Sequence, residues 1–128
     1  MRFSLSILLL ATLPFAPADS ARAGSHTAQP VAEIVTFRLK EGIDEVQFLS
    51  DAQATNTIVR SAPGFISRQL SKGKDNSWTD YILWQSLKDA QSAAKTIVND
   101  PAFAPFGQAI DFDSVEMRHE SVMWQMQQ

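Results

Sequence analysis

The order of strand-like and helix-like segments constrains the fold of this chain more than any other feature. Residues 31–40 (VAEIVTFRLK) are rich in β-branched side chains, which is typical of a strand. Residues 43–61 carry apolar side chains at three- and four-residue steps, which predicts a helix with one inner face. Two more strands are expected over residues 65–72 and 78–85, joined by the turn-forming cluster at 73–77.

The second half of the chain continues this alternation. A second helix is expected over residues 86–99, beginning at Ser86 or Leu87. A short helical turn over 101–110 and a last strand, roughly 114–126, complete the chain. The order β-α-β-β-α-β predicts an α+β, ferredoxin-like fold, in which a four-stranded antiparallel sheet carries both helices on one face.

The other face of such a sheet is left bare, yet the first strand is apolar on both sides. Val35 and Phe37 lie on one side, and Ala32 and Ile34 on the other. Tyr81 is also expected on the side away from the helices, because side chains alternate along a strand. A second sheet is therefore expected to cover the bare face, and the simplest source is a second copy in a two-fold homodimer.

The N-terminus has the three parts of a secretory signal. Arg2 supplies a positive charge, residues 3–13 are apolar, and Ala21-Arg22-Ala23 matches a signal-peptidase site. The apolar run is too short to span a membrane. Cleavage is expected after Ala23, with Ala18 as the alternative, so the mature protein is expected to be periplasmic or secreted and free of the membrane. The predicted segments are a signal peptide at 1–23, a flexible tail at 24–30, a domain at 31–124 and a C-terminal tail at 125–128.

Composition excludes several kinds of site. The chain has no cysteine, two histidines and a formal net charge of −3. It therefore has no disulfides, thiolate metal ligands or catalytic thiols. His26 lies in the predicted tail, so a multi-histidine metal site is not expected, and no metal or other cofactor is predicted. No cluster of basic residues is present, which makes nucleic acid an unsuitable partner.

Four sequence segments resemble the dimeric α/β-barrel superfamily, particularly its antibiotic-biosynthesis-monooxygenase-like (ABM-like) branch. They are VAEIVTFRLKEG, APGFISRQL, WTDYILWQSLKDA and NDPAFAPF. The resemblance covers Val31 to Trp124 and implies a dimeric α/β barrel. Members of this branch include cofactor-free oxygenases of quinol-like aromatics, haem-degrading enzymes and stress-related proteins without known chemistry, so the fold alone does not select a function.

The haem-degrading members can be tested residue by residue. They carry an asparagine in the first strand, a tryptophan in the second helix and an axial histidine after it. The resemblance places Val35, Ala93 and Gly107 (or Phe106) at those positions. Haem iron needs an axial ligand, which neither glycine nor phenylalanine supplies, so haem degradation is not expected.

The candidate catalytic residues are His119, Asn56 and Asp80. His119 is the only histidine in a predicted strand, and histidine exchanges protons near neutral pH; its alternative role is an ordinary side chain at the sheet rim or dimer contact. Asn56 falls on the inner stripe of the first helix, where it either orients a substrate oxygen or satisfies a backbone group. Asp80 would be costly if buried alone, so Arg38 or Arg68 is expected to pair with it.

Aromatic side chains are the candidates for a substrate pocket. Trp78 and Trp84 share one face of the third strand with Asp80, where they either form a pocket wall or belong to the core. Phe103 and Phe106 are expected to close one end of that core or pocket. The substrate-binding candidates are Trp78, Trp84, Phe103, Phe106 and Phe37. Glu33 is expected at the rim or in an ion pair, with catalysis as the alternative.

Two functions follow from these observations and the resemblance, and a purely structural domain with a filled core is the third possibility. The first is a cofactor-independent monooxygenase acting on an aromatic or quinol-like compound, since reduced nicotinamide and free flavin are scarce outside the cytoplasm. The alternative is a non-catalytic, ligand-binding or stress-response dimer that holds a small apolar or aromatic molecule. Convergence of Asn56, Asp80 and His119 on one cavity would favour the enzyme; scattering would count against it.

Overall fold

The computed structural model describes residues 28–128. The predicted signal peptide at 1–23 and the first part of the predicted tail lie outside these residues. The helices and strands, in chain order, are β1 (Val31–Leu39), α1 (Glu45–Ala54), α2 (Asn56–Ser61), β2 (Phe65–Lys72), β3 (Trp78–Trp84), α3 (Leu87–Ile97), the 3₁₀ turn η1 (Pro101–Phe103), α4 (Ala104–Ala109) and β4 (Ile110–Ser121).

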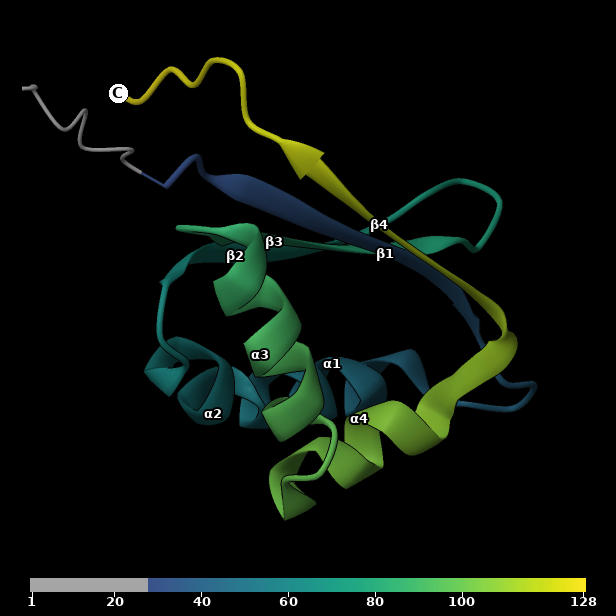
Figure 1. The fold of residues 1–128 in the computed structure, drawn as a ribbon. Helices are drawn as coiled ribbons and strands as arrows, with labels where there is room; N and C mark the ends of the chain where they lie inside the picture. The colour runs from purple at the N-terminus through teal and green to yellow at the C-terminus, as the bar shows by residue number, and fades with distance from the viewer. Residues whose placement is uncertain (1–27) are drawn as a thin grey trace, which may run out of the picture.

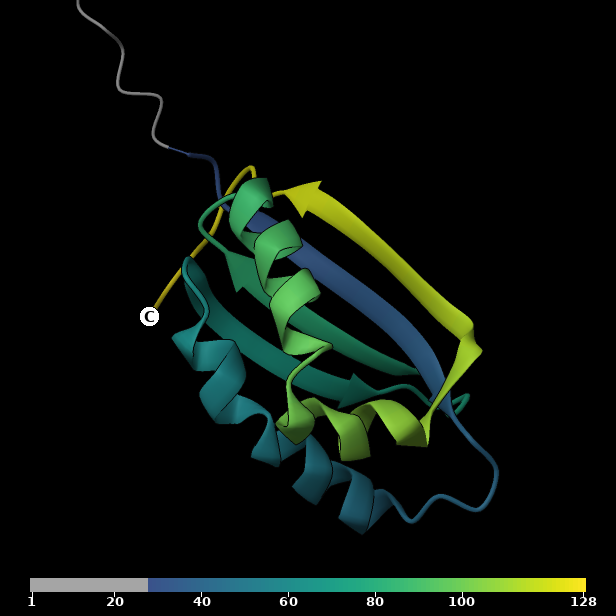
Figure 2. The same ribbon diagram turned by 60° about the horizontal axis from the view of Figure 1, so that its bottom comes forward.

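The four strands form one antiparallel sheet in the order β2-β3-β1-β4, which confirms the predicted ferredoxin-like topology. All the helices lie on one face of this sheet (Figures 1 and 2). The central strand β1 places Glu33 directly between Ile82 of β3 and His119 of β4. Strand β4 forms one edge of the sheet, so His119 lies beside the core rather than inside it.

Side-chain caps explain where the helices begin. The Asp44 carboxylate accepts a hydrogen bond from the Gln47 N–H at 2.8 Å before α1, and the Ser86 hydroxyl accepts one from the Asp89 N–H at 3.1 Å before α3. Each cap satisfies a backbone donor that the first helical turn leaves without a partner. The helices α1 and α3 begin at Glu45 and Leu87, within two residues of the predicted starts.

The predicted helix over 43–61 is divided into α1 and α2 at Thr55, and its buried face differs from the prediction. The buried residues are Phe48, Ala52, Thr55 and Val59, whereas Asn56 is exposed. The predicted stripe ran through Val46, Leu49, Ala52, Asn56 and Val59, but Val46 and Leu49 are exposed. Both stripes follow helical spacing, so periodicity alone did not choose between them. Burial of the large Phe48 ring decides the choice because it removes the most apolar area from water.

The core on the helix side of the sheet is mainly aromatic. Phe48 of α1 stacks on Phe106 of α4 and meets Trp78 of β3 edge to face, with ring centroids 5.3 and 4.9 Å apart. Phe37 of β1 meets both phenylalanines edge to face. Such arrangements stabilise beyond the area they bury. These rings join α1 and α4 to one end of the sheet, while Trp84 belongs to a separate cluster under α3.

The face of the sheet away from the helices carries a small apolar cluster. Ala32, Ile34 and Leu83 are buried there, with Tyr81 and Val122 packed against them. The chain after β4 lies on this side of the sheet (Figure 1), and β4 ends at Ser121, five residues before the predicted end. This face is therefore partly covered by the chain itself. Within residues 28–128 no helix is long and apolar enough to cross a membrane.

Candidate functional site

A cavity of about 160 Å³ lies between the helix-facing side of the sheet and the helices. Most of its wall is apolar. Three of its residues, Val98, Phe112 and Met117, are more than half exposed, so they mark the mouth of the cavity. The other lining residues are Glu33, Val35, Phe37, Thr55, Val59, Arg68, Asp80, Ile82, Ala94, Ile97, Phe103, Phe106, Ile110 and Val115.

The polar part of this wall includes a buried ion pair between Arg68 of β2 and Asp80 of β3. Arg68 Nη2 donates to Asp80 Oδ2 at 2.7 Å, and Arg68 Nε lies 2.9 and 3.2 Å from the two carboxylate oxygens. The side chains of Arg68 and Asp80 are 11% and 7% exposed. Two-point contact of this kind is the strongest arrangement open to an arginine and a carboxylate, and Arg68 was one of the two partners predicted for Asp80.

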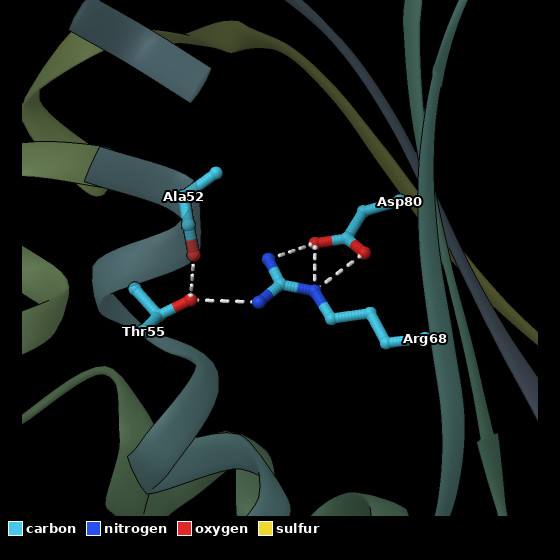
Figure 3. A network of polar contacts seen from close by, with 4 residues as sticks. All are labelled: Ala52, Thr55, Arg68 and Asp80. Atoms are coloured by element: carbon cyan, nitrogen blue, oxygen red, sulfur yellow. Dashed lines mark hydrogen bonds and ion pairs between the residues drawn. The ribbon is translucent and has the colours of Figure 1, made fainter. Parts of the chain in front are cut away.

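Thr55 links this ion pair to the helices (Figure 3). Its hydroxyl accepts a hydrogen bond from Arg68 Nη1 at 2.7 Å and donates one to the Ala52 carbonyl at 2.6 Å. The carbonyl of Ala52 also accepts a hydrogen bond from the Thr55 N–H, so the hydroxyl and the backbone amide of Thr55 share one acceptor at the end of α1. Hydroxyl contacts to the preceding turn commonly bend helices, which accounts for the break between α1 and α2.

A second acid, Glu33, lies in the same wall with a different partner. His119 Nε2 is 2.8 Å from Glu33 Oε2, across the β1–β4 pair. The Glu33 side chain is 6% exposed, whereas that of His119 is 24% exposed. His119 does not line the cavity. It lies on the side of Glu33 away from the cavity, and its side chain is partly exposed to solvent.

Burial raises the pKa of the Glu33 carboxyl above its ordinary value. The hydrogen bond and the charge of His119 lower this pKa, while the charge of Asp80 raises it further. The nearby indole of Trp84 also lowers it, although Trp84 Nε1 is buried without a hydrogen bond of ordinary geometry. Burial is the largest of these effects, so Glu33 holds a proton more readily than an exposed glutamate does.

The cavity therefore combines an apolar space with two unlike carboxyl groups. Asp80 receives two-point contact from Arg68, and both of its carboxylate oxygens accept hydrogen bonds from that side chain. Glu33 has one strong partner and a raised pKa, which suits a group that accepts and releases protons. Clusters of three or more side chains able to hold a metal ion do not occur within residues 28–128.

The predicted substrate-binding aromatics divide into two groups. Phe37, Phe103 and Phe106 line the cavity. Trp78 and Trp84 do not, because each packs inside an aromatic cluster, against Phe48 and Phe65 respectively. The structure therefore places both tryptophans in the core, which is one of the two roles predicted for them, and phenylalanines form the aromatic part of this cavity wall.

The predicted catalytic residues do not converge on one cavity. Asp80 lines the cavity, and His119 lies one hydrogen bond behind it through Glu33. Asn56 is exposed and takes no part in the wall, so its predicted position on the inner stripe was wrong. This scattering counts against a site made of those three residues.

Sequence reasoning missed Thr55, which takes the inner position expected for Asn56. The signal that identifies it is Phe48: a stripe begun at this large ring passes through Ala52 to Thr55. Glu33 was predicted first as a rim or ion-pair residue, with catalysis as the alternative. Its importance depends on the residue opposite in β4, and that register is not readable from local sequence.

No protein-family model and no curated protein sequence matches the chain. Solved structures do match its fold. A protein from Bordetella bronchiseptica, provisionally named an antibiotic biosynthesis monooxygenase, superimposes with a TM-score of 0.65 and 13% identity, over 75% of this chain and 99% of that chain. A protein of the same provisional name from Caulobacter crescentus gives a TM-score of 0.62 and 14% identity, over 77% and 93%.

A third match is SnoaB, a cofactor-independent oxygenase from Streptomyces nogalater. It superimposes with a TM-score of 0.53 and 20% identity, over 78% of this chain and 97% of that chain. At these identities the comparisons establish the fold. The chain has the ABM-like α+β fold, as the sequence segments predicted.

Proposed function

From the ABM-like fold and the cavity beneath its sheet, we propose that the protein binds a phenol of one or two rings and oxidises it with dioxygen, without a cofactor. The observation that carries this proposal is Glu33, a proton-accepting carboxyl buried in the wall of an otherwise apolar cavity. An apolar cavity with a few polar groups is the usual form of a small-molecule site.

The size of the cavity supports a small ligand. A volume of about 160 Å³ is close to the roughly 150 Å³ that holds a benzene ring. One aromatic ring therefore fits inside, against Phe37, Phe103 and Phe106. A second ring has room at the mouth, where Val98, Phe112 and Met117 are exposed.

The proposed reaction begins with loss of the phenolic proton to Glu33. The electron-rich phenolate then reacts with dioxygen at a free para carbon, where one oxygen atom becomes bonded to the ring. The other oxygen atom leaves as water, which carries away the para C–H proton and one proton that replaces the phenolic proton. A phenol and one dioxygen thus give a para-quinone and one water, so atoms and electrons balance.

Arg68 supplies stabilisation for the phenolate. Two of the five N–H groups of Arg68 have no protein acceptor within residues 28–128, because one donates to Thr55 and two donate to Asp80. Donors already held in place stabilise a developing anion without having to reorganise. Asp80 and Thr55 act in this scheme by holding the guanidinium in position.

Oxygen consumption with 1-naphthol tests the proposal. The purified protein, from residue 24 onward, is expected to convert 1-naphthol and dioxygen to 1,4-naphthoquinone and water. Glu33→Gln keeps the shape of the wall, and it is expected to lower kcat by about 10²–10⁴-fold while ligand affinity is retained. Ala94→Phe, which fills the cavity from α3, is expected to abolish binding; circular dichroism checks that both variants fold.

Binding without turnover is the second candidate function. It is supported by the scattering of Asn56, Asp80 and His119, which leaves few polar groups in the cavity. If 1-naphthol raises the melting temperature and Ala94→Phe removes that shift, yet no oxygen is consumed, the protein is a ligand-binding dimer rather than an oxygenase.

We also propose that the protein is exported and forms a homodimer. Export is supported by the basic, apolar and A-x-A pattern of residues 1–23. Dimerisation is supported by the tail beyond β4, where Met123, Trp124 and Met126 are each more than three-quarters exposed. Mass determination of the mature N-terminus tests the first, and light scattering of the purified protein tests the second.

A further inference from the structure

We propose that Glu33 and His119 form a two-residue proton relay from the cavity to the exposed edge of the sheet. This inference rests on the proposed function, because it concerns the fate of the proton that the phenol loses. Glu33 has to lose the phenolic proton before the next turnover, and the product water has to take up a proton in exchange. The relay exchanges both protons with solvent without opening the cavity to water.

The geometry of the pair suits an exit path. Glu33 is on a central strand and lines the cavity, whereas His119 is opposite it on the edge strand β4. Their nitrogen and oxygen are 2.8 Å apart, and exposure rises from 6% at Glu33 to 24% at His119. The two side chains therefore span the distance between the cavity wall and solvent.

The chemistry of the hydrogen bond suits proton transfer in either direction. When Glu33 is ionised, His119 Nε2–H donates to the carboxylate; when Glu33 is protonated, its O–H donates to an unprotonated Nε2. Glu33 takes the phenolic proton and passes a proton to the imidazole. The imidazolium then releases a proton to water, and the pair returns to its starting charge.

The surroundings of Glu33 leave His119 as its proton exit among residues 28–128. The groups that act on the Glu33 carboxyl are His119 from β4, and Asp80 and the Trp84 indole from β3. Asp80 is engaged with Arg68 of β2, and an indole N–H does not exchange protons near neutral pH. The cavity wall contributed by the helices is apolar apart from Thr55, whose hydroxyl is bonded to Arg68 and Ala52.

A structural role is the alternative for this pair, because a cross-strand hydrogen bond also stabilises the β1–β4 edge. His119→Gln separates the two roles. Its side-chain amide can still donate a hydrogen bond to Glu33, but it cannot carry a proton. His119→Ala removes both properties and leaves a gap, open to solvent, that free imidazole can enter.

The test follows the ionisation of bound 4-nitrophenol, which is coloured only as the anion and has no free para carbon to oxidise. After a rapid rise in pH, the wild-type protein is expected to develop colour quickly. His119→Gln is expected to slow this by about 100-fold or more, with affinity changed less than about twofold. Imidazole is expected to restore the rate in His119→Ala in proportion to its concentration, but not in Glu33→Gln.

The outcomes separate the relay from the proposed function. Equal ionisation rates in the wild type and His119→Gln would overturn the relay while leaving phenol binding intact. A slow His119→Ala that imidazole does not rescue would assign the histidine a structural role instead. If 4-nitrophenol does not bind at all, the proposed phenol site fails and the relay fails with it.

Discussion

Two buried carboxylates face the same cavity from neighbouring strands, and they differ in how completely they are paired. Asp80 of β3 receives two-point contact from Arg68, and Arg68 is tied in turn to Thr55. Glu33 of β1 has a single strong hydrogen bond, from a histidine that is partly exposed. Because their partners differ, we expect the two acids to have different roles in the cavity wall.

A buried two-point ion pair stabilises one arrangement of the chain, because any change in the charge of either member leaves a buried group without a partner. An acid with one titratable partner and a raised pKa can change charge at lower cost. Asp80 therefore helps to join sheet to helix through Arg68, whereas Glu33 has a partner that can exchange protons. The Arg68–Asp80 pair holds β2, β3 and the end of α1 in place around the cavity that Glu33 lines.

The largest effect on stability is expected from breaking the ion pair between Arg68 and Asp80. Arg68→Met leaves Asp80 buried without its cation, and we expect the free energy of unfolding to fall by about 3–5 kcal/mol in urea denaturation. The double variant Arg68→Met/Asp80→Leu removes both charges and is expected to recover most of that loss. If the single variant were as stable as the double one, Asp80 would not depend on Arg68.

A smaller effect is expected at the link to the helices. Thr55→Val removes the hydroxyl that accepts from Arg68 and should lower the free energy of unfolding by about 1–3 kcal/mol, because a buried donor loses its partner. Thr55→Ser keeps the hydroxyl and serves as the matched control. A loss in Thr55→Val no larger than that in Thr55→Ser would mean that the hydroxyl contributes no more to stability than the methyl group does.

The Glu33 carboxyl is expected to show its difference from Asp80 in the pH dependence of stability. Its pKa is raised above the ordinary 4.5 in the fold, so its contribution is complete below that pH and declines as pH rises through the folded value. The wild type should therefore lose stability relative to Glu33→Gln between pH 4.5 and neutrality, by less than the Thr55 effect.

Urea denaturation at several pH values measures this difference. The same comparison in a His119→Gln background removes the titration of the imidazole from the result. A wild type that gains stability relative to Glu33→Gln as pH rises would mean that the pKa of Glu33 is lowered in the fold, contrary to the prediction.

The smallest effect is expected at an exposed ion pair on the same edge strand. Arg118 and Glu120 of β4 are 2.8 Å apart, but both side chains are more than half exposed. Glu120→Gln should change the free energy of unfolding by less than about 1 kcal/mol, because solvent screens the pair. A loss as large as that of Arg68→Met would mean that burial is not what separates the pairs.

Much of the site could be placed from the sequence, but fewer of its hydrogen bonds and ion pairs could be predicted. The alternation of β1 put Glu33 and Phe37 on one face of that strand, and the alternation of β3 put Asp80 and the two tryptophans on one face of theirs. These shared faces are confirmed, because one strand's faces depend only on a period of two. That both faces turn toward the helices comes from the structure. The tryptophans shared that face but belong to the core, since alternation does not tell a cavity wall from a filled interior.

The sequence by itself determined the order of the elements, the approximate starts of the two main helices and the residues that share each face of a strand. These are local properties, set by side chains within a few residues of one another. Only the tertiary structure decided that Thr55 rather than Asn56 is inside, that Arg68 rather than Arg38 pairs with Asp80, and that His119 stands behind Glu33. Such choices depend on strand register and on packing between distant segments, where a shift of one residue exchanges an inner side chain for an outer one.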